Sequence, residues 1–149
     1  MKGIGAFVVV LLVALGVVMY VVTRPPSREL DAQSQAWVDG FEAWRTPMER
    51  KVERATVGLT FASRAANDRL LEPLRTCTRS LLRLGPPPDL VVSAHEAAVA
   101  ACGRAEHAAV LNERFDTASL ATIRLHLNEA GDQLRLAARN LRVALGGAS

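Results

Sequence analysis

Apolar and small residues recur at spacings of three and four along most of the chain beyond residue 36. This is the period of a helix that buries one side, and no stretch shows the strict alternation typical of a strand. The positions before a proline-rich break at 85–89 are Trp37, Phe41, Trp44, Met48, Val52, Ala55, Leu59, Ala62, Ala66, Leu70, Leu74, Cys77, Leu81 and Leu84. Those after it are Val92, His95, Val99, Cys102, Ala105 and Ala109, then Leu120, Ile123, Leu127, Ala130, Leu134, Ala137, Leu141 and Leu145. The pattern predicts an all-α fold.

Prolines divide the first of these stretches. Thr46 is a favoured N-cap residue, Pro47 suits the first helical position, and Glu49 completes a capping box. We therefore expect one helix over 27–45 and a second from 47 onward. A later proline, Pro73, removes a backbone hydrogen bond and is expected to kink or end that second helix near Asn67 and Asp68.

The stretch LGPPPDL at 84–90 is the strongest break in the chain. Gly85 is expected to end the preceding helix in a left-handed conformation, and the three prolines after it cannot continue a helix. The next helix is capped either by Asp89 or by Ser93, whose capping-box partner is Glu96.

Two further helices follow the break. The first is rich in alanine and ends near 112–115, and the last begins at 116–119 and ends at Gly146. Because short connections make neighbouring helices antiparallel, the expected fold is an up-down bundle of three to four helices over residues 29–146.

Residues 4–22 form an apolar run of 19 positions without a charge. At 1.5 Å per residue a helix of this length spans about 28 Å, close to the hydrocarbon thickness of a bilayer. We expect a transmembrane signal anchor over 1–23, a proline-containing spacer over 24–28, and a bundle that lies outside the cytoplasm. The alternative is a signal peptide cleaved at the small residues Ala14 and Gly16.

The chain has two cysteines, Cys77 and Cys102, one on each side of the break. In an antiparallel hairpin they differ in height by roughly one turn, or about 5 Å, which permits a disulfide. An even cysteine count after an export-like segment favours the bond over two buried free thiols. Closing this loop would stabilise the fold by about 3 to 3.5 kcal/mol.

Composition and charge narrow the possible partners. The chain is 50% hydrophobic and 5% aromatic, which fits a core of interdigitated aliphatic helices. The net charge is +3, and 16 of the 18 basic residues are arginine. So small a positive balance reflects composition more than a polyanionic partner, and we do not expect the protein to bind nucleic acid.

No group of side chains has the spacing that catalysis requires. A di-iron bundle needs repeated Glu-x-x-His pairs, whereas His126 and Glu129 share a face in the reversed order and without a second copy. His95 shares a stripe with Cys102 and is interpreted as a partly buried, hydrogen-bonded side chain. There is no nucleophile elbow, phosphate loop or Cys-x-x-Cys pair. We therefore expect a non-enzyme without a metal or other cofactor.

Two groups of residues are candidates for an interaction surface. Arg75, Arg79 and Arg83 form a basic stripe at four-residue spacing, which suits anionic headgroups or an acidic partner and is also typical of a solvated face. The second group consists of three aromatic residues close to the apolar run: Trp37, Phe41 and Trp44. Their rings either belong to the core or form an interface with a membrane partner.

The layout of one N-terminal span and an Arg- and Ala-rich bundle is similar to that of many small envelope proteins of high-GC bacteria, without a motif specific to one family. We expect a single-pass protein of the cytoplasmic membrane that acts through a protein partner, as an accessory or adaptor subunit of an envelope complex. The alternatives are a ligand-sensing bundle and a metal- or haem-binding bundle that uses His95, His107 or His126.

Overall fold

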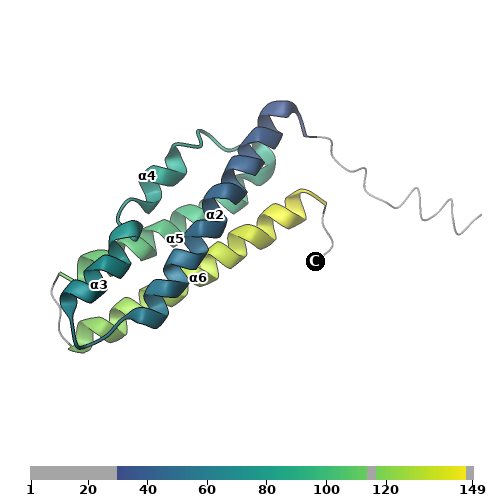
Figure 1. The fold of residues 1–149 in the computed structure, drawn as a ribbon. Helices are drawn as coiled ribbons and strands as arrows, with labels where there is room; N and C mark the ends of the chain where they lie inside the picture. The colour runs from purple at the N-terminus through teal and green to yellow at the C-terminus, as the bar shows by residue number, and fades with distance from the viewer. Residues whose placement is uncertain (1–29, 114–116, 147–149) are drawn as a thin grey trace, which may run out of the picture.

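The computed structural model describes residues 30–113 and 117–146, in which every regular element is a helix (Figure 1). In chain order the elements are α2 (Ala32–Gly58), α3 (Arg64–Leu71), the 3-10 turn η1 (Glu72–Leu74), α4 (Cys77–Leu82), the 3-10 turn η2 (Asp89–Val91), α5 (Val92–Leu111) and α6 (Thr117–Ala144). The all-α prediction is confirmed for these residues.

The predicted signal anchor at 1–23 and spacer at 24–28 lie outside the described residues. Within 30–113 and 117–146, no helix combines the length and the apolarity that crossing a bilayer needs. The membrane span at 4–22 therefore stays a prediction.

The helices form one packed bundle in which the chain runs alternately up and down (Figure 1). The long helices α5 and α6 make the most extensive contact, and α2 packs mainly on α6. The shorter elements α3, η1 and α4 return between α2 and α5. The start of α2, the proline turn and the end of α6 meet at one end of the bundle, which we call the proximal end (Figure 1). We call the opposite end, where α2 stops and α6 begins, the distal end.

Helix α2 is continuous through Pro47, so the predicted division into helices at 27–45 and from 47 onward is wrong. The supposed capping box does not form. Instead, Arg45 binds Glu42 and Glu49 at 2.7 Å each, so that one guanidinium links the turns before and after the proline. The cap of α2 is Asp31, which accepts a hydrogen bond from the Ser34 amide at 2.7 Å.

Packing explains why the helix tolerates this proline. Pro47 itself is exposed, whereas Phe41, Met48 and Val52 are buried on the side that faces the rest of the bundle. A proline inside a helix costs about 3 kcal/mol, and burying a large apolar side chain contributes about 1.5–3 kcal/mol. An unbroken helix buries these side chains on both sides of Pro47, which offsets the lost hydrogen bond.

The chain breaks at 59–63, where the spacing of apolar residues predicted an uninterrupted helix. The buried Asn67 side chain stabilises this loop, because it accepts from the Thr60 amide at 2.9 Å and donates to the Thr60 carbonyl at 2.8 Å. Ser63 then caps α3 by accepting from the Ala66 amide at 3.2 Å. The loop is thus fixed by the side chains of Asn67 and Ser63, whose contacts periodicity alone does not reveal.

The predicted breaks at Pro73 and Gly85 are both present, but the helix before Pro73 continues past Asn67 and Asp68, where its end was expected. Helix α3 ends just before Pro73, which lies in η1, and Gly85 has a φ of +79°. The predicted cap of the next helix is wrong, because neither Asp89 nor Ser93 caps it with its side chain. Instead, η2 leads directly into α5, stabilised by a hydrogen bond from the Val91 amide to the Pro88 carbonyl at 2.9 Å.

The core confirms the predicted stripe of α6 and corrects that of α5. In α6 the stripe from Leu120 to Leu141 is buried, while Leu145 is partly exposed. In α5 the predicted Val99 is exposed, and the buried face consists of small residues: Ala94, Ala97, Ala98, Ala101, Cys102, Ala105, Ala108 and Ala109. Small side chains let α5 approach its neighbours closely, and the larger valine is left at the edge.

Candidate functional site

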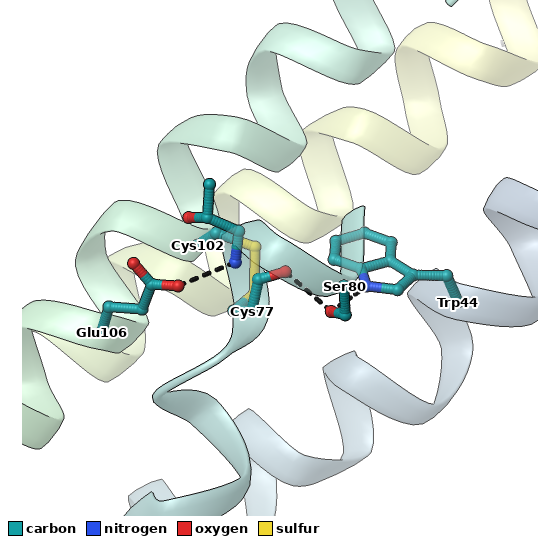
Figure 2. Close-up of a disulfide and its surroundings, with 6 residues drawn as sticks. Trp44, Cys77, Ser80, Cys102 and Glu106 are labelled. Carbon is teal, nitrogen blue, oxygen red and sulfur yellow. Dashed lines mark hydrogen bonds between the residues drawn. A yellow bond between two sulfur atoms is a disulfide. The ribbon is translucent and has the colours of Figure 1, made fainter. Parts of the chain in front are cut away.

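The predicted disulfide between Cys77 and Cys102 is present and joins α4 to α5 across the proline turn (Figure 2). The two Cα atoms lie 5.1 Å apart, and both cysteines are buried. The proline turn and the bond therefore act together, because the turn reverses the chain and the bond closes the resulting hairpin.

Polar contacts surround this bond and fix the short helix α4. The Glu106 carboxylate, on α5, accepts from the Thr78 amide at 2.8 Å and so satisfies a donor in the first turn of α4 (Figure 2). The Ser80 hydroxyl donates to the Cys77 carbonyl at 2.7 Å and accepts from the Trp44 indole at 2.8 Å. Helix α4 is thereby tied to α5 by the disulfide and Glu106, and to α2 by Trp44.

The aromatic residues proposed for an interaction surface belong to the bundle interior. Trp37 and Phe41 are buried, with ring centroids 5.0 Å apart, and Trp44 is partly buried against the core. The Trp37 indole also donates to the Gly85 carbonyl at 3.3 Å. These rings therefore attach α2 to the proline turn and to α4, which agrees with the first of the two alternatives, a place in the core.

The proposed basic stripe is not one continuous feature. Arg75 lies in an acidic environment, with contacts of 3.0 Å to Glu72 and 3.1 Å to Glu113. Arg79 and Arg83 are exposed, and neither has an ion pair within the described part of the chain. Arg75 thus links the connecting elements to the end of α5, whereas Arg79 of α4 and Arg83 just after α4 remain on the surface.

The histidines lie in two places. His95 packs against Trp37 with ring centroids 6.1 Å apart, and burial lowers the pKa of His95 below its ordinary value. His107 of α5 and His126 of α6 lie together, with ring centroids 4.7 Å apart and nearly perpendicular planes. Sequence reasoning missed this pair because its members are 19 residues apart on different helices, and only the register of the hairpin brings them together.

The carboxylate of Glu129 lies beside the second histidine. Its Oε2 atom is 3.3 Å from His126 Nδ1 and 3.2 Å from Arg104 Nε. The Arg104 Nη1 atom is 3.5 Å from the same ring nitrogen. The four side chains form a polar cluster on the outer side of the α5–α6 pair, which we call the histidine cluster: Arg104, His107, His126 and Glu129.

A groove of about 630 Å³ lies at the proximal end. It lies between the start of α2 and the proline turn, and its lining includes Asp31, Trp37, Leu84 and Pro87. A ligand-sensing bundle, the alternative function, would use this groove. The lining also includes polar side chains: Gln33, Ser34 and Asp89.

Within residues 30–113 and 117–146, no three His, Cys, Asp or Glu side chains are grouped to hold a metal ion in the present arrangement. The predictions of a non-enzyme and of a protein without a cofactor stay predictions. No protein-family model, curated protein or solved structure matches the chain.

Proposed function

We propose that the protein is anchored in the cytoplasmic membrane by residues 4–22 and that its bundle stands outside the cytoplasm. There it acts as an accessory or adaptor subunit of a bacterial cell-envelope complex. The observation that carries this proposal is the buried disulfide between Cys77 and Cys102.

Redox chemistry supports the compartment. Structural disulfides persist in oxidising surroundings such as the bacterial periplasm and are rare in the cytosol, where thiols are kept reduced. The bond is buried, and both cysteines of the chain are used in it. Together with the apolar run at 4–22, which is long enough to span a bilayer, it favours a bundle held outside the inner membrane.

The shape of the bundle supports a role in contacts at a distance from the membrane. Residue 30 lies at the proximal end, and α2 extends for 27 residues from there, which corresponds to about 40 Å. The distal loop at 59–63 would therefore stand well clear of the bilayer. It carries an exposed aromatic ring, Phe61, and follows the exposed Val57 at the end of α2. We place the protein partner at this end.

Site-specific photocrosslinking in native membranes tests the proposal. A photoreactive amino acid is placed at Phe61 in the full chain, and the matched control places it at Leu82 on α4. The two positions are equally exposed, at 59% and 60%, and both are apolar. We expect one envelope protein, identified by mass spectrometry, to be captured at position 61 and not at position 82.

Two results would overturn the proposal. One is recovery of the protein crosslinked exclusively to itself at both positions. The other is fractionation of the mature chain into the cytosol with Cys77 and Cys102 as free thiols, measured by alkylation and intact mass under non-reducing conditions.

A further inference from the structure

The groove at the proximal end carries negative charge that no described basic side chain balances. Its two charged side chains are Asp31, at the start of α2, and Asp89, in η2. None of the described residues that line the groove is basic, and neither carboxylate forms an ion pair within 30–113 and 117–146. A hollow lined by charges of one sign attracts the opposite charge. The groove therefore favours a cationic occupant.

The rest of the groove offers an apolar surface. Leu84, Pro87 and Pro88 line it and are each partly buried. Trp37, which also lines the groove, donates to the Gly85 carbonyl at 3.3 Å, so α2 and the proline turn are in direct contact here. Proline-rich segments dock on apolar grooves because their preformed helix loses little conformational entropy. An apolar surface beside two carboxylates suits a segment that contains both prolines and arginines.

The chain supplies such a segment directly before the groove. Residues 24–28 read Arg-Pro-Pro-Ser-Arg, with two positive charges and no negative one. They end two positions before residue 30, where the described residues begin next to Asp31, the cap of α2. Five residues in a polyproline helix extend about 16 Å, and packed helices lie about 8–10 Å apart. The segment is therefore long enough to cross from α2 to the proline turn.

We propose that the spacer at 24–28 docks in the proximal groove of its own chain. Arg28 then lies near Asp31 at the start of α2, and Arg24 lies near Asp89 at the proline turn. The two prolines between them contact the apolar lining. Exposed ion pairs are weak individually. A short tether, however, keeps the spacer at an effective concentration on the order of millimolar, at which weak contacts suffice.

Docking fixes the direction in which the bundle leaves the spacer. In a chain anchored as proposed above, a docked spacer holds the distal end at a set orientation to the membrane, whereas an undocked one lets the bundle swing. This consequence rests on the proposed function. The docking itself does not, because it involves residues of this chain alone, so its test can fail while the adaptor role stands.

The distance between two spin labels in the full chain in detergent tests the proposal. One label is attached at Ser27→Cys and the other at Glu96→Cys, an exposed position on α5, while both native cysteines stay in the disulfide. We expect one narrow distance distribution. Asp89→Arg and Arg24→Asp should each at least double its width. Combining the two changes should restore the narrow distribution, because the pair forms again with its charges exchanged.

The matched control is Asp132→Arg, which replaces an exposed aspartate of α6 outside the groove and should leave the distribution unchanged. Asp89 is exposed and makes no capping hydrogen bond, so its replacement should preserve the fold, which circular dichroism checks. An excess of unlabelled chain should have no effect. A distribution that changes on this dilution would assign the groove to the spacer of a second copy and overturn the proposal, as would equal widths in the parent and Asp89→Arg.

Trypsin provides a readout without labels. The bond after Arg24 precedes a proline and resists trypsin, so cleavage within the spacer occurs after Arg28. Mass spectrometry should show that wild type is cut there several-fold more slowly than Asp89→Arg, and that Asp132→Arg is cut at the wild-type rate. Equal rates in wild type and Asp89→Arg would mean that the spacer does not occupy the groove.

Discussion

The long helices and the short connecting elements of this bundle are stabilised in different ways. Helices α2, α5 and α6 have 27, 20 and 28 residues and bury continuous apolar faces. The connecting elements α3, η1 and α4 have 8, 3 and 6 residues. Helices this short are not stable by propensity alone. They depend on side-chain caps, on Trp44 and Glu106, and on the disulfide.

The difference implies that the two regions fail separately. Losing a buried side chain from the long helices removes apolar burial that the whole bundle shares, so global stability should fall. Losing one of the hydrogen bonds or the disulfide that hold the connecting elements should release α4 first. Helix α4 buries few side chains of its own: Cys77 and Leu81. Local opening of such weakly packed elements is a general property of proteins.

The largest effect is expected from Phe41→Ala in the long helix α2. The ring is fully buried between Trp37 and Trp44, and truncating such a side chain costs about 3–5 kcal/mol. The matched control is Leu82→Ala on α4, whose side chain is 60% exposed, with an expected effect within about 0.5 kcal/mol. Urea denaturation followed by circular dichroism measures both. Equal losses would remove the distinction between the two regions.

The next effect comes from replacing both cysteines, Cys77→Ala and Cys102→Ala. In the chain-entropy model, removing this loop constraint lowers the free energy of unfolding by about 3 to 3.5 kcal/mol. Hydrogen exchange should show faster exchange of the α4 amides while those of α6 stay protected until global unfolding. Uniformly faster exchange along the whole chain would mean that α4 is not an independent unit.

The regions also differ in how far the sequence predicts them. The stripe of α6 and the turn at Gly85 followed from periodicity and from backbone chemistry, which are local. Hairpin register permitted the disulfide, and the even cysteine count after an export-like segment favoured it over free thiols. The continuity of α2 through Pro47 could not be predicted in this way, because it depends on burial against α6. The loop at 59–63 could not be predicted either, because Asn67 stabilises it from the following helix.

The candidate site was less predictable than the fold. His126 and Glu129 could be placed on one face of a helix from their spacing alone. His107 and Arg104 join them from α5, and their approach depends on the rotation of that helix about its axis. The predicted stripe of α5 was wrong in part, because it placed Val99 inside, whereas Cys102, Ala105 and Ala109 are buried as predicted. In α5 close approach of the backbones decides the buried face instead.

A smaller effect is expected from Glu106→Ala, which removes the acceptor of the Thr78 amide at the start of α4. Losing a side-chain cap costs about 0.5–2 kcal/mol. The matched control is Glu96→Ala, an exposed glutamate near the start of the same helix. We expect a measurable loss of stability and faster exchange of the Thr78 amide for the first variant alone. Identical behaviour of the two variants would show that the disulfide fixes α4 without the help of Glu106.

The smallest effect concerns the junction of α2 with the start of α5, where His95 packs on Trp37. Desolvation by burial lowers the pKa of His95 below its ordinary value of 6.5, and the nearby Glu96 opposes this. The unfolded chain therefore binds a proton at a higher pH than the folded chain does. The contribution of neutral His95 is fully present above pH 6.5 and is lost as the pH falls below that value.

The measurement compares wild type with His95→Gln in urea at pH 7.5 and pH 5.5. Because His95 is partly and not fully buried, the extra loss of stability in wild type at pH 5.5 should be small. His107 and His126 are present in both proteins, so their contributions cancel when the two are compared. A larger acid-induced loss in His95→Gln than in wild type would contradict the predicted direction. Since Trp37 also donates to the Gly85 carbonyl, acidification in wild type should loosen the proline turn before it affects α6.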